Sequence, residues 1–108
     1  MNVTALSERL GLEKDEFLEL VELFLETGKS DLGQLKVAVQ TEDIEEVVKS
    51  SHSIKGASGN LGFMEIFEVA KDVELNARQD RLDGASEAVD TIKKHLDQIA
   101  IEITGETA

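Results

Sequence analysis

The residues of this 108-residue sequence that could do chemistry together lie between Ser51 and Gly62. On a helix of about 100° per residue, His52 lies about 130° from the centre of the neighbouring apolar residues, so its imidazole points towards solvent. Gly56 and Gly59 follow one and two turns later on the same side of the helix. Two glycines inside a helix cost roughly 2 kcal/mol relative to alanine. An exposed imidazole on a surface cleared of side chains would explain why they are there.

The chemistry that this arrangement suits is nucleophilic attack on a phosphoryl group. A neutral imidazole is a good nitrogen nucleophile, and exposed histidine side chains are mostly neutral at about pH 7. Lys55, three residues after His52, could stabilise the negative charge of the product. From the residues alone, three plainer interpretations stay open: a surface histidine without a function, glycines that let two helices pack closely, and a lysine in solvent.

Apolar spacing predicts the helices that must position this segment. The expected helices span residues 4–10, 13–40, 44–61, 64–78 and 85–103, with ends at Gly11 and Gly62 and a frayed tail at residues 104–108. The long second helix is expected to bury Phe17, Leu20, Val21, Phe24, Leu25, Leu32, Leu35 and Val39. Gly28 and Gly33 weaken the prediction of one continuous helix, so a bend near residues 28–33 stays open.

These segments favour an all-α fold. Four substantial amphipathic helices with short connections predict an antiparallel four-helix bundle, with the short extra N-terminal helix covering one end. The sequence contains no internal repeat, low-complexity segment or linker. We therefore expect residues 1–108 to form one domain, with a core from about residue 10 to residue 103.

The composition argues against several classes of function. Asp and Glu number 23 against 11 Lys and Arg, a net charge of −12, which disfavours binding to nucleic acid or anionic lipid. The absence of cysteine excludes disulfides and thiolate metal sites, and no apolar stretch of about 18 residues could span a membrane. Residues 1–9 do not resemble a signal peptide, so we expect a cytoplasmic protein. Neither a G-x-x-x-x-G-K-[ST] loop nor a kinase-type glycine loop is present, which argues against an ATP-binding enzyme.

The acidic residues are unevenly distributed along the chain. Residues 13–40 hold seven acidic and three basic residues, whereas residues 44–61 hold two of each. The helix that carries His52 is therefore neutral in an acidic protein. Its lysine lies on the side where an anionic phosphoryl group would be received.

Residues 52–62 read H-S-I-K-G-A-S-G-N-L-G. They match every fixed position of the H-x-[IL]-K-G-x-x-x-x-L-G signature of the histidine-containing phosphotransfer (HPt) domains of bacterial and fungal phosphorelays. The sequence also resembles this family at Phe17–Leu25, at the turn Thr41–Asp43 and at Val69–Glu74, so that the similarity covers about residues 10–103. The resemblance implies a four-helix bundle in which the phosphorylated histidine is exposed midway along one helix.

The resemblance also implies roles for single residues. It makes His52 the phosphoacceptor, attacking through Nε2, Lys55 the cation that stabilises the phosphoryl group, and Gly56 the small residue that gives a receiver domain access. Gly59 and Val48 lie on the same strip of the helix and are further candidate partner contacts. Val48 could equally be the edge of the core.

At the position of Glu74 some relatives carry a glutamine that hydrogen-bonds near the histidine. Here the residue is a glutamate. A role for Glu74 in orienting His52 and a plain helix-surface or pairing role therefore both stay open.

A protein of this family would be a covalent phosphoryl carrier without an ATP site. It would accept the group from an aspartate of a receiver domain, or from a kinase, and pass it to a response-regulator aspartate. The partner receiver domain would supply Mg²⁺, so we expect no cofactor or metal of its own, and a monomer. Two alternatives stay open: the phosphoacceptor domain excised from a chemotaxis-type histidine kinase, which shares the H-S-I-K-G string, and a non-catalytic helical adaptor.

A helical metal site is disfavoured by the positions of the two histidines. Such sites use a glutamate three residues before a histidine, and neither His52 nor His95 has one. His95 lies among Lys93, Lys94 and Asp97 and is expected to be a solvated surface residue.

Overall fold

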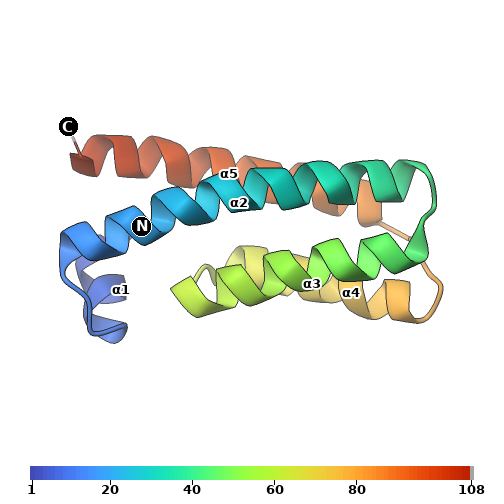
Figure 1. Ribbon diagram of the computed structural model, residues 1–108, viewed down its shortest axis with the longest axis horizontal. Helices are drawn as coiled ribbons and strands as arrows, with labels where there is room; N and C mark the ends of the chain where they lie inside the picture. The colour runs from blue at the N-terminus through green and yellow to red at the C-terminus, as the bar shows by residue number, and fades with distance from the viewer. Residues whose placement is uncertain (108) are drawn as a thin grey trace.

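Five helices form the part of the chain that the computed structural model describes, residues 1–107 (Figure 1). They are α1 (Val3–Arg9), α2 (Lys14–Gln40), α3 (Ile44–Leu61), α4 (Met64–Arg78) and α5 (Ala85–Thr107). From α2 to α5 the helices alternate in direction along the long axis, and α1 lies at the end of the bundle where α2 begins (Figure 1). The predicted all-α fold, an antiparallel four-helix bundle with a short N-terminal helix, is confirmed.

The core lies between the four long helices. α2 packs against α3 and α5, and α4 packs against the same two helices. The side chains that are buried most completely include Phe17, Leu35, Ile54, Ile66 and Ile92, at least one from each long helix. Within residues 1–107 no helix combines the length and the apolar character needed to cross a membrane.

The buried face of α2 differs from the prediction at one leucine. Leu20 was expected in the core but is 41% exposed, whereas Leu18 is buried. The cause is that α2 packs against two helices at once, which widens its buried face beyond a single narrow stripe. Leu18 and Leu25 extend this face on one side and leave Leu20 at its opposite edge.

α2 runs without a break from Lys14 to Gln40, so the helix is not interrupted at residues 28–33. Gly28 is buried, and a Cβ there would lie 3.4 Å from Leu96 Cδ2. This glycine therefore lies where α2 approaches α5 closely. Gly33 is exposed, and a Cβ there would meet no described atom within 4 Å.

α3, the helix that carries His52, begins and ends where the sequence predicts. Asp43 caps its N-terminus by accepting a hydrogen bond from the backbone N–H of Glu46 at 3.2 Å. At its other end Gly62 has φ +86°, a left-handed conformation that favours glycine. A Cβ at Gly62 would also collide with the guanidinium of Arg9, so α1 rests directly on the C-terminus of α3. A cation at that end of a helix is electrostatically favourable.

Residues 104–107, where the sequence predicts a frayed tail, continue α5 as helix. Ile103 is buried and anchors the last turns to the core. Lys14 Nζ lies 2.8 Å from Glu106 Oε2, and the N-terminal ammonium lies 3.0 Å from Glu102 Oε1. Both ion pairs join the end of α5 to residues near the start of the chain. Residue 108 lies outside the described residues.

Candidate functional site

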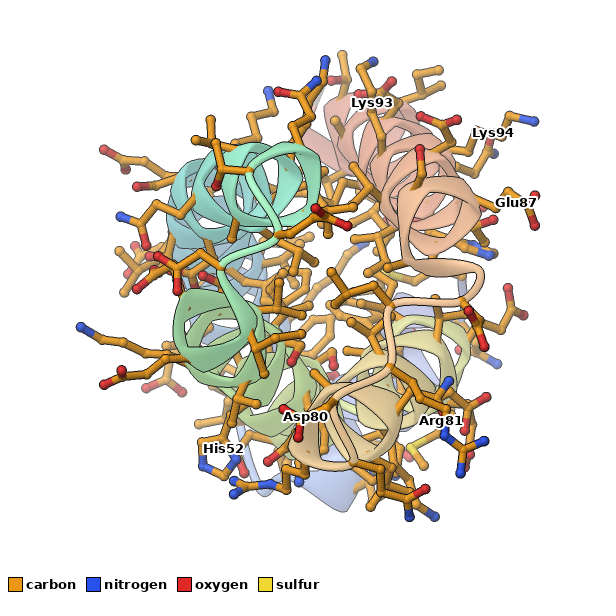
Figure 2. All side chains as sticks on the ribbon, turned by 90° about the vertical axis from the view of Figure 1, so that its right-hand side faces the viewer. His52, Asp80, Arg81, Glu87, Lys93 and Lys94 are labelled. Carbon is orange, nitrogen blue, oxygen red and sulfur yellow. The ribbon has the colours of Figure 1, made fainter. Side chains whose placement is uncertain are left out.

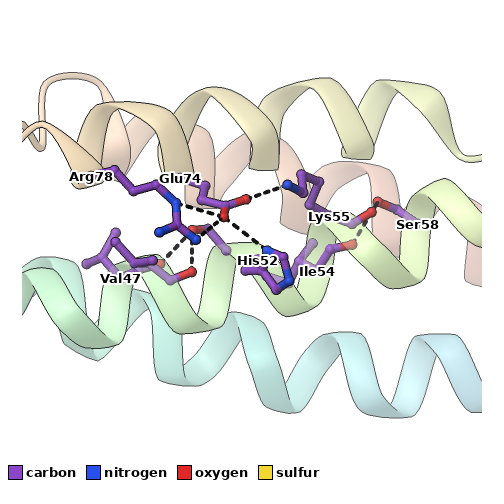
Figure 3. Close-up of polar contacts among 9 residues, drawn as sticks. Val47, His52, Ile54, Lys55, Ser58, Glu74 and Arg78 are labelled. Atoms are coloured by element: carbon purple, nitrogen blue, oxygen red, sulfur yellow. Dashed lines mark hydrogen bonds and ion pairs between the residues drawn. The ribbon is translucent and has the colours of Figure 1, made fainter.

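α3 and α4 lie side by side and bring four polar side chains together, His52 and Lys55 from α3 and Glu74 and Arg78 from α4 (Figure 3). Glu74 is at the centre of this group. Its Oε2 lies 3.0 Å from His52 Nδ1, and its Oε1 lies 2.8 Å from Lys55 Nζ. Arg78 also donates to Oε2, through Nη2 at 2.7 Å and Nε at 3.1 Å. One carboxylate therefore holds an imidazole, an ammonium and a guanidinium.

Glu74 is buried, with only 3% of its surface exposed. Burial by itself raises the pKa of a carboxyl group, but the ammonium of Lys55 and hydrogen bonds from Arg78 and His52 outweigh it and lower the pKa of Glu74 to about 2. The carboxylate is therefore ionised at neutral pH. Of the two roles left open for Glu74, a place on the helix surface is wrong. The residue pairs with two cations and contacts His52 directly.

The imidazole of His52 projects from the bundle, with 62% of its side chain exposed (Figure 2). An ionised carboxylate can only accept hydrogen bonds, so Nδ1 carries a proton and its N–H donates a hydrogen bond to Glu74. In the neutral imidazole the lone pair is then on Nε2, on the side of the ring that faces away from Glu74 (Figure 3). The nitrogen through which attack is expected is thus the one that faces away from Glu74, and its role stays a prediction.

Lys55 lies one turn after His52 and is half-buried, with 27% of its side chain exposed. Its ammonium is held at Glu74 Oε1. Within residues 1–107 this buried oxygen accepts no hydrogen bond of regular geometry, so the contact with Lys55 is chiefly electrostatic. The structure places Lys55 beside His52, as expected, and its role towards a phosphoryl group stays a prediction.

The surface beside His52 is open at one of its two glycines only. A Cβ at Gly56 would meet no described atom within 4 Å. A Cβ at Gly59 would lie 3.0 Å from Phe67 Cδ2, so Gly59 is half-buried and does not face solvent freely, and its role as a partner contact stays a prediction. α4 covers this position, and the small residue lets the two helices pack closely. Val48 is half-buried and packs against the core, in agreement with the second interpretation given to it.

A sequence model of the Hpt domain matches residues 19–102, which is most of the chain. The chain belongs to the Hpt domain family. The family resemblance drawn from residues 52–62 is therefore confirmed by a match that extends over all four long helices.

Two known proteins resemble this Hpt domain over most of its length. The phosphorelay intermediate protein rdeA of Dictyostelium discoideum is 25% identical over 87 residues, which are 81% of this chain and 34% of that protein. The chain thus spans about a third of the length of that curated relative. The crystal structure of histidine-containing phosphotransfer protein B (HptB) from Pseudomonas aeruginosa PAO1 has a similar fold, with a TM-score of 0.82 and 25% identity. That match covers 96% of this chain and 88% of the HptB chain.

Arg78 is the residue at the site of this Hpt domain that the sequence interpretation missed. It follows Glu74 by four residues, a spacing at which opposite charges meet on one face of a helix. This signal was present in the sequence. It does not show that the pair faces α3 and His52, because that depends on how α4 is rotated in the bundle.

Three serines of α3 are buried, and two of them, Ser51 and Ser58, bond to the backbone of their own helix. Ser51 Oγ donates to the carbonyl oxygen of Val47 at 2.6 Å, and Ser58 Oγ donates to that of Ile54 at 2.7 Å. Both hydroxyls are therefore satisfied within the helix, and burying them leaves no unpaired donor.

His95 of this Hpt domain is not the solvated residue that was expected. It is half-buried, and its Nδ1 lies 3.2 Å from Glu65 Oε2, so it links α5 to the first turn of α4. Among residues 1–107 no group of three or more histidine, aspartate and glutamate side chains is arranged to hold a metal ion.

Proposed function

We propose that this Hpt domain is an intermediate of a phosphorelay. His52 accepts a phosphoryl group on Nε2 from an aspartyl phosphate of one receiver domain and passes it to an aspartate of a response regulator. The observation that carries this proposal is an exposed imidazole whose Nδ1 is bound to the buried, ionised Glu74. Membership of the Hpt domain family and the similarity to a protein named as a phosphorelay intermediate support it.

Transfer onto His52 requires no proton movement within this chain. Nε2 attacks the phosphorus, the Nε2–P bond forms, and the P–O bond to the aspartate breaks as the carboxylate leaves with the electron pair. Nδ1 keeps its proton, so the phosphorylated ring bears a positive charge that the carboxylate of Glu74 stabilises from 3.0 Å. In the second transfer the electron pair of the P–N bond returns to Nε2, and the ring becomes neutral again.

The chain contributes position and charge, and in this proposal Mg²⁺ and the catalytic carboxylates belong to the receiver domain. Lys55 stabilises the phosphoryl oxygens from the same helix. Gly56 leaves the approach to His52 open. Val48 is partly buried against the core, so only its exposed part can contact a partner. The proposal includes a monomer in the cytoplasm, which meets receiver domains through the face that carries His52.

A labelling experiment tests this function. The protein is incubated with the receiver domain of a hybrid histidine kinase that carries ³²P on its aspartate, and the label is tested for lability in acid and stability in base, which mark phosphohistidine. We expect His52→Gln to lose the label. His95→Gln, which removes the other of the two histidines, should keep it and serves as the matched control. Equal labelling of His52→Gln and the parent would overturn the proposal.

The same experiment separates the alternative functions. Labelling by an ATP-dependent histidine kinase but not by the receiver domain would point to a phosphoacceptor domain of the chemotaxis type. Absence of labelling by both donors would favour a non-catalytic helical adaptor.

A further inference from the structure

The side chains at the site carry more positive than negative charge. Glu74 supplies one negative charge, while Lys55 at Oε1 and Arg78 at Oε2 supply two positive charges. Either cation alone would balance one carboxylate. The second cation is therefore available for another task during part of the reaction cycle.

Lys55 is the cation that can move. Phosphorylation of His52 adds close to two negative charges on the side of the ring that faces away from Glu74. Lys55 is one turn away on the same helix, its contact with Oε1 lacks regular hydrogen-bond geometry, and its stem is flexible. Its departure would nevertheless leave a charged oxygen of a carboxylate that is 3% exposed without compensation, which is costly.

Arg78 is placed to take over this compensation. Arg78 lies one turn after Glu74 on α4, and its Nε and Nη2 both donate to Glu74 Oε2. The planar fork of a guanidinium matches the two oxygens of a carboxylate, so a small shift lets Arg78 span both. The side chain of Arg78 is 55% exposed, which leaves room for that shift.

We infer that Arg78 is a positioning residue, which takes over the charge of Glu74 and so releases Lys55 to the phosphoryl group. This inference rests on the proposed phosphorylation of His52. Without Arg78, Lys55 stays on Glu74 and is not free to approach the phosphoryl group at His52. Phosphorylation of His52 then becomes slower.

Phosphoramidate, a small phosphoryl donor, tests this without a receiver domain. Its P–N bond breaks and ammonia leaves from the protonated nitrogen with the electron pair, while the Nε2–P bond of His52 forms. We expect Arg78→Gln to slow labelling of His52 about tenfold. Arg81→Gln removes the same charge from an exposed loop residue whose bond is to Gln79, and it should leave the rate within about twofold of the parent.

The decisive comparison adds Glu74→Gln, which removes the charge of the carboxylate and keeps an oxygen that can accept from His52 Nδ1. Lys55 is already free in that background, so a further Arg78→Gln should change the labelling rate by less than about twofold. A loss of the same size in both backgrounds would overturn the inference, because Arg78 would then act on the phosphoryl group itself. An unchanged rate for Arg78→Gln in the parent would overturn it as well.

Nitrogen NMR of the Lys55 ammonium provides a second measurement, which does not depend on the stability of Glu74→Gln. Phosphorylation of His52 should shift this signal in the parent and leave it in place in Arg78→Gln. Equal shifts in the two proteins would refute the release of Lys55. Phosphoramidate labels an accessible histidine whether or not the protein serves a relay, so failure with receiver domains would count against the proposed function alone.

Discussion

Replacing Gly56 with arginine should leave the bundle folded and block transfer from a receiver domain. A Cβ at this position meets no described atom within 4 Å, so the new side chain displaces nothing in the bundle. Arginine is a better helix former than glycine by roughly 1 kcal/mol. For a domain of this size the substitution should therefore raise the melting temperature by about 4 °C.

The same side chain would cover His52. Side chains on a helix lean towards its N-terminus, so a residue at position 56 leans towards position 52, one turn earlier. A receiver domain must bring its aspartate in line with Nε2, and an arginine in that path prevents close approach. We expect at least about a tenfold loss in the transfer rate, equivalent to roughly 1.4 kcal/mol of lost interaction.

The assay compares two donors on the same protein. Transfer from the ³²P-labelled receiver domain should fall in Gly56→Arg, while labelling by the much smaller phosphoramidate should stay within about threefold of the parent. Gly33→Arg is the matched control, because Gly33 is also an exposed helical glycine with no described atom within 4 Å of its Cβ position. If Gly56→Arg transfers as fast as Gly33→Arg, the surface at Gly56 is not where the receiver docks and the reasoning fails.

Two further predictions concern the groups around the site. The pKa of Glu74 is lowered from 4.5 to about 2, so its ionisation contributes about 3 kcal/mol of stability that is present above pH 4.5 and is lost as the pH falls towards 2. The gap in unfolding free energy between the parent and Glu74→Gln, measured in urea, should therefore shrink over that range, and a gap independent of pH would contradict it. Gly56→Ala should stabilise the protein by about 1 kcal/mol, and Gly59→Ala by less than half of that, because its Cβ would press on the ring of Phe67 at 3.0 Å. Equal gains in thermal unfolding would show that this ring does not restrict position 59.

The orientation of His52 could be predicted from the sequence because it depends on one helix alone. Apolar residues on α3 mark its buried side, and the angle from them places the imidazole in solvent. Gly59 lies close to His52 on the same wheel, yet its surroundings depend on a second helix. A single wheel distinguishes core from solvent, and it cannot show that α4 covers the flank of α3 at Phe67.

Glu74 could not be predicted for a related reason. A glutamate is rarely buried, so a helical pattern assigns it to the surface unless its partners are known. Here the partners come from two helices, since Lys55 and His52 lie on α3 and Arg78 lies on α4. The pair within α4 is visible in the sequence, whereas the pairs across to α3 depend on the rotation of both helices in the bundle.

Contacts near the two ends of the described chain also could not be predicted from a local sequence pattern. Residues 104–107 carry little apolar character, so the sequence predicts fraying. The N-terminal ammonium and Lys14 nevertheless bind Glu102 and Glu106, residues about ninety or more positions away in the chain. Contacts between residues so far apart follow from the fold and cannot be read from a local pattern.

The position of the charges explains how an acidic protein can receive an anionic group. A net charge of −12 acts on a phosphoryl group only over the distance that salt leaves unscreened, about 8 Å at physiological ionic strength. The side chains that contact His52 or its carboxylate partner are Lys55, Arg78 and Glu74, with a balance of one positive charge. The sequence shows that α3 carries no net charge, which is favourable for receiving an anion. This count omits two residues of α4. Glu74 pairs with Lys55 and cancels its charge, and Arg78 returns the balance at the site to one positive charge. The charge that a phosphoryl group meets at Nε2 is therefore set by the pairing of α3 with α4.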